Sequence, residues 1–372
     1  MVRRRRHSPS RNSVWSITSA MSGEDSYNEL DVELCGQYGH LTSSQKETLS
    51  SFKERLHKDG YYRPADPTVD GTTPSHDDVT LLRFLRGKAF DIPKAAAQFA
   101  QTEEWRKTKK ATESYASIKP EELSDTRRFF PRWTGHRDKH GRPLYVWRLS
   151  TVGPLVKELN ALSPQDRERR MIALYENLRL FTMRLCSCAK SEGFPTPIGS
   201  TTVRSCFIAN CRGLMFHLLL QNIIDLEGVS LGLIWSLRSH FQASAGLAST
   251  AYPEFLSRVF VVNAPGFFPT AWSYVKGFFD EGTQRKVFIL GINPAPEILK
   301  FVNAADLPKV YGGELEWSLM DPPKLDDELR ALLKRDEFPE GPNVFVSDTA
   351  TSGAMIPFDV NKASVLEAQN IY

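Results

Sequence analysis

The segment Ala251–Gly291 constrains the fold of this chain more than any other part of it. It contains two short apolar runs, Val259–Val262 and Val287–Leu290, on either side of a stretch with helical spacing. Apolar runs this short, separated by a helix, predict neighbouring strands of an α/β sheet. The intervening helix, Pro269–Phe279, is aromatic along one side, and polar residues stand beside both runs. An apolar helix with a few polar groups at one rim suits a site for a lipid with a charged headgroup.

Composition excludes several other classes of protein. The 372 residues are enough for one large or two modest domains, and the 41% hydrophobic content is ordinary for a globular protein. No apolar run reaches the roughly 18 residues of a membrane span. The five cysteines have neither CxxC nor zinc spacing, so we expect reduced thiols, no metal site and no cofactor.

The positive charge is concentrated at the start of the chain. Residues 1–23 carry five arginines and no acid, whereas the remaining 42 basic and 44 acidic residues nearly balance. This balance gives no basic field for nucleic acid. The start has the composition of a mitochondrial transit peptide, but its apolar residues form no clean helical face. We therefore expect a disordered basic tail over residues 1–42, with mitochondrial targeting by residues 1–20 as the alternative.

Local patterns divide the rest of the chain into three parts. Residues 43–125 form a small helical domain, residues 126–320 an α/β domain, and residues 321–372 a C-terminal helix with a polar, loop-like tail from Asp336. The expected helices are Ser43–His57, Asp77–Arg86, Pro93–Lys110, one capped by Ser163, Ser230–Ala248, Pro269–Phe279, Ala295–Val302 and Asp326–Lys334; the further expected strands are Leu144–Leu149 and Leu218–Leu226.

Four motifs follow one another in a fixed order. They are LLRFLRGKAFDIPKA at 81–95, YPE at 252–254, VNAP at 262–265 and TxxKxFILG at 283–291. Together they resemble the CRAL-TRIO lipid-binding family, in particular its fungal phosphatidylinositol/phosphatidylcholine transfer branch, over about residues 43–320. The resemblance implies an α/β CRAL-TRIO domain with a mixed β-sheet and a lipid cavity, preceded by a small all-helical domain.

The resemblance assigns a phosphatidylinositol headgroup site to Glu254, Thr283, Lys286 and Lys88, the last at a position where the family normally has arginine. The chemistry fits, because a phosphodiester needs a cation and a hydroxyl donor, and inositol hydroxyls need an acceptor such as a carboxylate. Lysine supplies a point charge without the arginine fork. Without the resemblance, a surface salt bridge and a solvated helix end are the simpler readings.

The helix Pro269–Phe279 has two readings. Its apolar arc includes Trp272, Val275, Phe278 and Phe279. Periodicity alone predicts packing against a core. The resemblance implies the family's mobile gate, whose aromatic side chains enter the bilayer while a lipid exchanges.

The site for a second lipid departs from the family pattern. Thr134 occupies a tyrosine position, Tyr145 is retained further along, and Thr201 and Asn222 are the nearest equivalents of a Ser/Thr pair. We therefore expect an altered choline site, where a sterol or another hydrophobic cargo could replace phosphatidylcholine. The nineteen residues 203–221 interrupt the pattern between Thr202 and Asn222, and our hypothesis is a short intron retained in frame.

A GxSxG sequence at 228–232 raises the alternative of a hydrolase, because it follows a predicted strand and precedes a predicted helix. However, His240 is the only histidine after Ser230 and stands just ten residues on, so the usual order of a catalytic triad fails.

The sequence therefore predicts a lipid-transfer protein that is not an enzyme. It would exchange phosphatidylinositol and a second hydrophobic lipid between membranes and support phosphoinositide metabolism and vesicle trafficking. We expect a cytoplasmic monomer that contacts Golgi, endosomal or ER membranes transiently and binds no nucleic acid. Binding of another ligand, such as a sterol, is the alternative.

Overall fold

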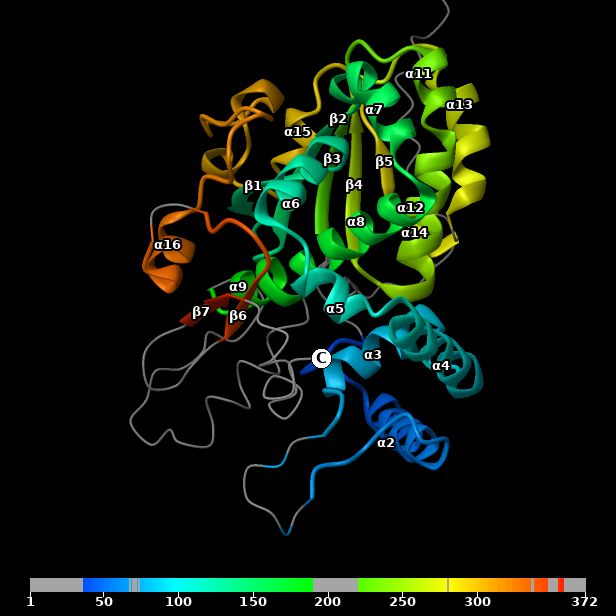
Figure 1. The fold of residues 1–372 in the computed structure, drawn as a ribbon. Helices are drawn as coiled ribbons and strands as arrows, with labels where there is room; N and C mark the ends of the chain where they lie inside the picture. The colour runs from blue at the N-terminus through cyan, green and yellow to red at the C-terminus, as the bar shows by residue number, and fades with distance from the viewer. Residues whose placement is uncertain are drawn as a thin grey trace, which may run out of the picture. The chain divides into compact units, whose positions relative to one another are not determined.

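A computed structural model describes residues 36–189, 220–335, 338–346 and 354–357, apart from residues 67, 69–71, 73 and 280. The expected basic tail and most of the interruption at 203–221 lie outside the described residues. The described residues all belong to one compact unit, in which helices surround a central sheet (Figure 1).

The three helices expected near the start are confirmed within two residues at their ends. Thr42 and Gln45 form a capping box at the start of the first, and Asp77 and Asp91 cap the other two through their side chains. Aromatic rings, among them Phe52 and Phe99, pack between them. The helices of this part are α2 (Ser43–Lys58), α3 (Asp78–Gly87), α4 (Ile92–Lys109), α5 (Ala111–Ala116) and α6 (Pro120–Thr126), followed by the 3₁₀ turn η1 (Arg127–Phe129).

The central sheet has five strands in the order of the chain, and it is mixed, as predicted. Its strands are β1 (Arg132–Arg137), β2 (Pro143–Arg148), β3 (Leu220–Asp225), β4 (Leu256–Val262) and β5 (Val287–Ile289). β1 is antiparallel to β2, and the other pairs are parallel. The expected pairing of the two runs in the segment Ala251–Gly291 is confirmed, with Val259 opposite Val287.

Each face of the sheet has its own core. Side chains alternate along β4, so Val259 and Val261 face one core while Phe260 and Val262 face the other. The first core includes side chains of α11 (Leu231–Ser236) and α13 (Phe268–Val275), and the second includes Ile298 of α15 (Ala295–Ile298). Both faces of the parallel part are therefore covered, as parallel sheets require.

The remaining helical segments surround these layers. They are η2 (Leu149–Leu155), α7 (Val156–Ala161), α8 (Pro164–Asn177), the wide π turn η3 (Leu178–Thr182), α9 (Met183–Ser187), α12 (Arg238–Ala251), η4 (Lys276–Phe278), α14 (Glu281–Arg285), η5 (Ala304–Asp306), η6 (Lys309–Tyr311) and α16 (Asp327–Leu333). The expected continuous helix Ser230–Ala248 is wrong, because the chain breaks at Leu237 into α11 and α12. No described helix is both long and apolar enough to cross a membrane.

The expectation of a loop-like tail after Asp336 is also wrong. β6 (Asn343–Val346) pairs antiparallel with β7 (Ala354–Pro357). Val344 and Phe345 are buried against residues of η3, and the Tyr115 hydroxyl donates to the carbonyl of Asn343 at 2.8 Å. Burial of these two apolar side chains stabilises a strand that the polar composition of the tail concealed.

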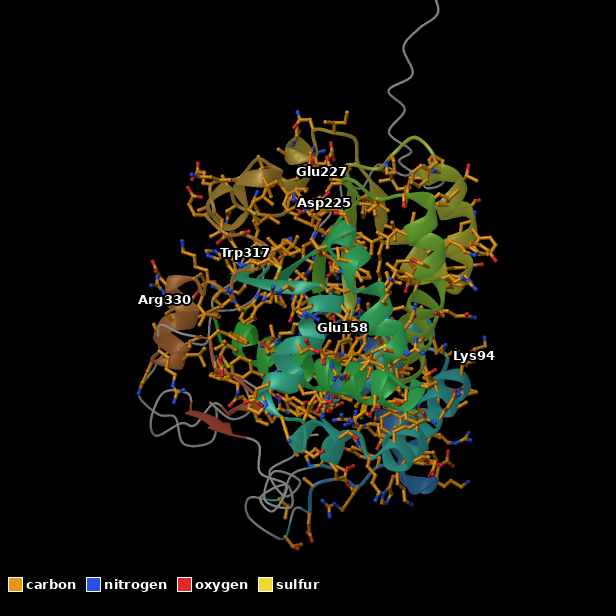
Figure 2. All side chains as sticks on the ribbon, turned by 45° about the horizontal axis from the view of Figure 1, so that its top comes forward. Lys94, Glu158, Asp225, Glu227, Trp317 and Arg330 are labelled. Atoms are coloured by element: carbon orange, nitrogen blue, oxygen red, sulfur yellow. The ribbon has the colours of Figure 1, made fainter. Side chains whose placement is uncertain are left out.

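Asp225 lies at the carboxyl end of β3, where Figure 2 also labels Glu227. Its buried carboxylate accepts hydrogen bonds from Arg148 Nε at 2.8 Å, from the Tyr311 hydroxyl at 3.0 Å and from Asn263 Nδ2 at 2.9 Å. These bonds tie β3 to β2, to η6 and to the loop after β4.

Candidate functional site

A cavity of about 370 Å³, which we call the main cavity, lies between the sheet and helices α12 and α13. Its walls are mostly apolar and include Val259 and Val261 of β4, Phe268 and Trp272 of α13, and Ala245 of α12. This volume is within the range of about 300–1,000 Å³ that is typical of ligand sites. The first core of the sheet is thus hollow where α12 and α13 meet it.

All four predicted headgroup residues, Lys88, Glu254, Thr283 and Lys286, line this main cavity. Lys286 Nζ donates to Glu254 Oε2 at 3.1 Å, and these two side chains are 23% and 20% exposed. The ion pair therefore belongs to the cavity wall while keeping contact with solvent. Its assignment to a lipid headgroup stays a prediction.

Glu254 reaches the cavity through a strained turn. Its φ is +57°, a left-handed conformation that costs a residue with a Cβ about 1–2 kcal/mol. Contacts on both sides of Glu254 hold the turn: the Tyr252 hydroxyl donates to Glu176 Oε1 at 2.7 Å, and the Arg83 guanidinium lies over the Phe255 ring at 4.7 Å. Strain that the surroundings impose is typical of binding sites.

Lys88 reaches the same cavity from the end of α3. A Cβ added to Gly87 would lie 3.6 Å from Glu254 Cγ, so the last turn of this helix adjoins the carboxylate. The backbone leaves the helix through Ala89 and Phe90, which have φ of +49° and +63°. Two successive left-handed residues turn the chain sharply and leave Lys88 at the cavity wall.

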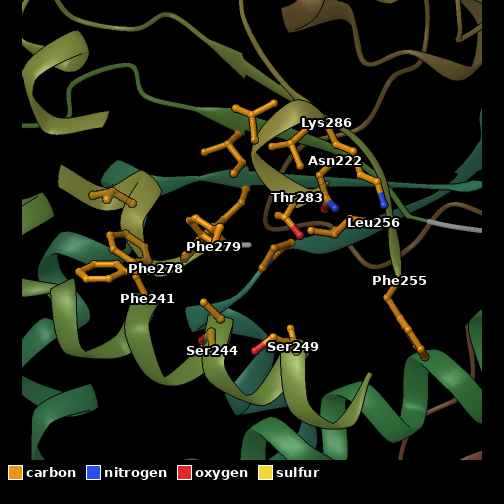
Figure 3. A pocket seen from close by; sticks show the side chains of 18 of the residues that line it. Asn222, Phe241, Ser244, Ser249, Phe255, Leu256, Phe278, Phe279, Thr283 and Lys286 are labelled. Atoms are coloured by element: carbon orange, nitrogen blue, oxygen red, sulfur yellow. The ribbon is translucent and has the colours of Figure 1, made fainter. Parts of the chain in front are cut away.

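Thr283 and Lys286 are placed by the link between α14 and β5. The Lys286 amide donates to the Thr283 carbonyl at 3.1 Å, and the Lys286 carbonyl accepts from the Val259 amide at 2.8 Å. These bonds fix the link against β4. Figure 3 shows Thr283 and Asn222 pointing into the space above Ser244 and Ser249 of α12.

The predicted gate residues Trp272, Val275, Phe278 and Phe279 all line the main cavity. Trp272 stacks near Phe268 and Phe279, with ring centroids 6.2 and 6.5 Å apart. The outer side of the same segment is apolar too, because Tyr274 is 58% exposed and packs on Trp235 of α11 at 5.6 Å. The segment thus forms a wall with aromatic residues on both sides, while its opening stays a prediction.

The structure separates the four residues predicted for a second lipid. Thr134 is fully buried, its hydroxyl donates to the Leu144 carbonyl at 3.1 Å, and it lines neither this cavity nor the next. Tyr145 and Asn222 line a second cavity of about 350 Å³, and Asn222 lines the main cavity as well. Thr201 lies outside the described residues.

Sequence reasoning missed two groups of polar residues at the site. Ser244 and Ser249 of α12 line the main cavity, and the run of small residues in this helix was the available signal. Tyr175 of α8 lines both cavities, and no motif of the sequence singled it out.

Glu176, next to Tyr175, joins three parts of the fold. Its buried carboxylate accepts from Arg106 of α4 at 2.7 Å, from Arg179 at 2.6 Å and from the Tyr252 hydroxyl at 2.7 Å. Burial alone would raise the pKa of this carboxyl, but the two guanidinium groups outweigh it and hold the pKa well below its usual range. The helical part is thereby fastened to the turn that presents Glu254.

The GxSxG segment does not form a nucleophile site. Ser230 has an extended backbone, with φ −98° and ψ 156°, and its hydroxyl accepts from the Leu233 amide at 3.1 Å as a helix cap. His240 packs against the rings of Phe130 and Trp147, and burial lowers its pKa to about 4. Within the described residues, no group of His, Cys, Asp and Glu is arranged to hold a metal ion.

A mixed sheet with a hollow apolar core and a few charged wall residues is the architecture of a lipid-binding α/β domain. Residues 132–313 match the CRAL/TRIO domain and residues 48–101 its N-terminal domain. The Sec14 cytosolic factor of Schizosaccharomyces pombe is 30% identical over 281 residues, which cover 76% of this chain and 86% of that protein. The phosphatidylinositol/phosphatidylcholine transfer protein SFH7 of Arabidopsis thaliana is 28% identical over 242 residues, covering 64% of this chain and 40% of that protein.

The fold agrees with these matches. The crystal structure of Sfh5 superposes with a TM-score of 0.53 and 16% sequence identity. The match covers 81% of this chain and 93% of the Sfh5 chain. The chain therefore belongs to the CRAL-TRIO family of Sec14-like lipid-transfer proteins, and the predicted family and fold are confirmed.

Proposed function

We propose that the protein binds phosphatidylinositol in the main cavity and exchanges it between membranes. The observation that carries this proposal is the Glu254–Lys286 pair, which lines an apolar cavity together with Lys88 and Thr283. The two lysines can neutralise a phosphodiester, Thr283 can donate to it, and Glu254 can accept from inositol hydroxyls. The same pair without a cavity would be an ordinary surface salt bridge.

A protein that carries a lipid through water needs an apolar cavity for energetic reasons. Two acyl chains hold about thirty methylenes, and their exposure to water costs on the order of 20 kcal/mol. Withdrawal of a lipid from a membrane needs an apolar wall that offsets most of this cost. The aromatic wall of α13 and η4 supplies it. The exposed Tyr274 of this wall and the exposed Trp235 of α11 suit transient contact with a bilayer.

In the cell, we expect this exchange to support phosphoinositide metabolism and vesicle trafficking. The protein would act as a cytoplasmic monomer that visits Golgi, endosomal or ER membranes. The S. pombe relative is named a cytosolic factor, which supports the expected cytoplasmic location.

Transfer of labelled phosphatidylinositol between liposomes tests the proposal, with Lys286→Ala as the variant. Loss of a charge-assisted hydrogen bond, worth about 1.5–3 kcal/mol, should lower transfer roughly 10- to 100-fold. Lys300→Ala is the matched control, because Lys300 pairs with Glu297 at 2.8 Å and does not line the main cavity. Undiminished transfer by Lys286→Ala would contradict the headgroup assignment.

The same preparation separates the alternatives. A protein built for a sterol would bind labelled sterol and tolerate Lys286→Ala, because a neutral ligand does not need this cation. A hydrolase would lose activity with Ser230→Ala, whereas lipid exchange should withstand the loss of this helix cap, which costs about 1 kcal/mol of stability.

A further inference from the structure

The second cavity, of about 350 Å³, adjoins the main cavity. The two share Phe130, Pro131, Tyr175, Asn222 and Leu256 in their walls. Other wall residues of the second cavity come from η1, β1, β2, η3 and the segment 338–341. A ligand in the main cavity could therefore extend past Asn222 and Tyr175 into the second.

An arginine without an anionic partner lines this second cavity. The guanidinium of Arg127, in η1, lies over the Phe338 ring at 5.3 Å. Its Nη2 atom is buried, and among the described residues the group has neither a hydrogen-bond acceptor nor an ion-pair partner. The adjacent Arg128 differs, because it pairs with Asp125 at 3.0 Å and with Glu158 at 2.5 Å.

The charges around the cavity favour an anion. Arg132 also lines it, and Glu340 is the single carboxylate among its described wall residues. Burial lowers the pKa of Arg127, whereas Tyr145, Tyr115 and Glu340 raise it. A guanidinium keeps its proton under these conditions. A buried cation without a partner costs free energy that an anionic ligand would recover.

Neutral donors complete the site. The Tyr145 hydroxyl has only a 3.5 Å contact with Thr182 Oγ1. In the part of the chain that the structure describes, the side chains of Tyr175 and Asn222 form no hydrogen bond with the protein. Hydroxyl and amide groups that lack partners beside a cation are the groups that bind an oxyanion.

We propose that the second cavity binds the oxyanion of a second, negatively charged lipid, a phosphate monoester or a carboxylate, on Arg127. The acyl part of this lipid would pass Asn222 and Tyr175 into the main cavity. The inference rests on the proposed function, because it assumes a lipid in the main cavity. Choline would be a poor ligand here, because its fixed positive charge would face the Arg127 guanidinium.

Binding of oleate and of phosphatidic acid to the full chain tests this proposal, with phosphatidylcholine as the comparison lipid. Affinity is measured by displacement of a fluorescent fatty acid, and bound lipid by native mass spectrometry. Arg127→Gln should weaken binding of at least one anion roughly 10- to 100-fold. Arg127→Lys, which keeps the charge without the fork, should lose less. Arg128→Gln is the matched control and should bind as the wild type does, since Arg128 does not line the cavity.

The unfolding temperature separates a binding role from a structural one. Because Arg127 is a partly buried cation with no anionic partner among the described residues, Arg127→Gln should leave the unfolding temperature of the ligand-free protein unchanged or higher. If Arg127→Gln loses only the binding of phosphatidic acid, the oxyanion that Arg127 binds is a phosphate. If it loses only the binding of oleate, the oxyanion is a carboxylate.

The proposal is overturned if Arg127→Gln binds both anions as tightly as the wild type does. It is also overturned if the wild type prefers phosphatidylcholine to both anions. Phosphatidylinositol transfer, measured on the same protein, distinguishes failure of this inference from failure of the proposed function. Wild-type protein that transfers phosphatidylinositol but binds neither anion would overturn this inference alone. Anion binding without phosphatidylinositol transfer would overturn the proposed function alone.

Discussion

Glu176→Gln should destabilise the protein strongly, because the carboxylate is the shared partner of two guanidinium groups. Glu176 is fully buried, while Arg106 and Arg179 are 16% and 11% exposed. The substitution keeps the volume and removes the negative charge, so both cations lose their counter-charge away from solvent. Removal of one partner from a buried ion pair costs about 3–5 kcal/mol. At about 2 °C per kcal/mol, the unfolding temperature should fall by about 6–10 °C.

Glu168→Gln is the matched control for this change. Glu168 is also on α8 and also pairs with a base of α4, Lys109, at 2.7 Å, but these side chains are 34% and 38% exposed. An exposed pair of this kind contributes about 0–1 kcal/mol. Thermal unfolding followed by circular dichroism at pH 7 gives both values. A shift for Glu176→Gln within about 2 °C of the control, on the same scale, would refute the reasoning.

The pH dependence gives a second check on the same residue. Because the folded pKa of the Glu176 carboxyl lies below its ordinary value of 4.5, its contribution to stability is fully present above that pH. As the pH falls below 4.5, the unfolded chain takes up the proton first and the contribution declines. The difference in stability between wild type and Glu176→Gln should therefore be constant from pH 7 to 5 and shrink at lower pH.

Two further changes test other parts of the fold. Ala89→Gly should raise the free energy of unfolding by about 1 kcal/mol, because glycine adopts the φ of +49° at this position without strain. Ala97→Gly, within α4, is the control and should lower the free energy of unfolding by about the same amount. Urea unfolding measures both changes, and a change of the same sign in both variants would contradict the argument. His240→Phe should flatten the loss of stability between pH 6.5 and 4. Burial lowers the pKa of His240 to about 4, so the stabilisation by the neutral ring is fully present above pH 6.5 and declines as the pH falls to 4, because the unfolded chain takes up the proton first. An unchanged slope across that window would show that protonation of His240 is not responsible for the loss.

The local patterns predicted most regular elements for identifiable reasons. Helices such as α2 have both a capping box and an apolar face, so residues within the segment itself indicate where the helix begins and ends. The runs at 259–262 and 287–290 are short and apolar, which limits them to strands of a covered sheet. β6 escaped prediction because the surface that buries it, on η3, is far away in the sequence.

The structure brings together some of the residues that the motifs predicted for the candidate lipid sites, but not others. Motifs named Lys88, Glu254, Thr283 and Lys286, and all four line one cavity. Motif positions failed for Thr134, because its burial depends on the hairpin of β1 and β2, where its hydroxyl is used by the Leu144 carbonyl. A position in a motif therefore did not predict which way the side chain points.

The sequence by itself determined the family, the central strands and the charged residues of the main cavity, because these depend on short patterns within single segments. Tertiary structure alone decided that Glu176 holds two arginines and Tyr252, and that Arg127 faces a second cavity without an anionic partner among the described residues. Ion pairs, burial and cavities depend on segments that are distant in the chain. No local pattern encodes which of many similar arginines will find a carboxylate and which one will not.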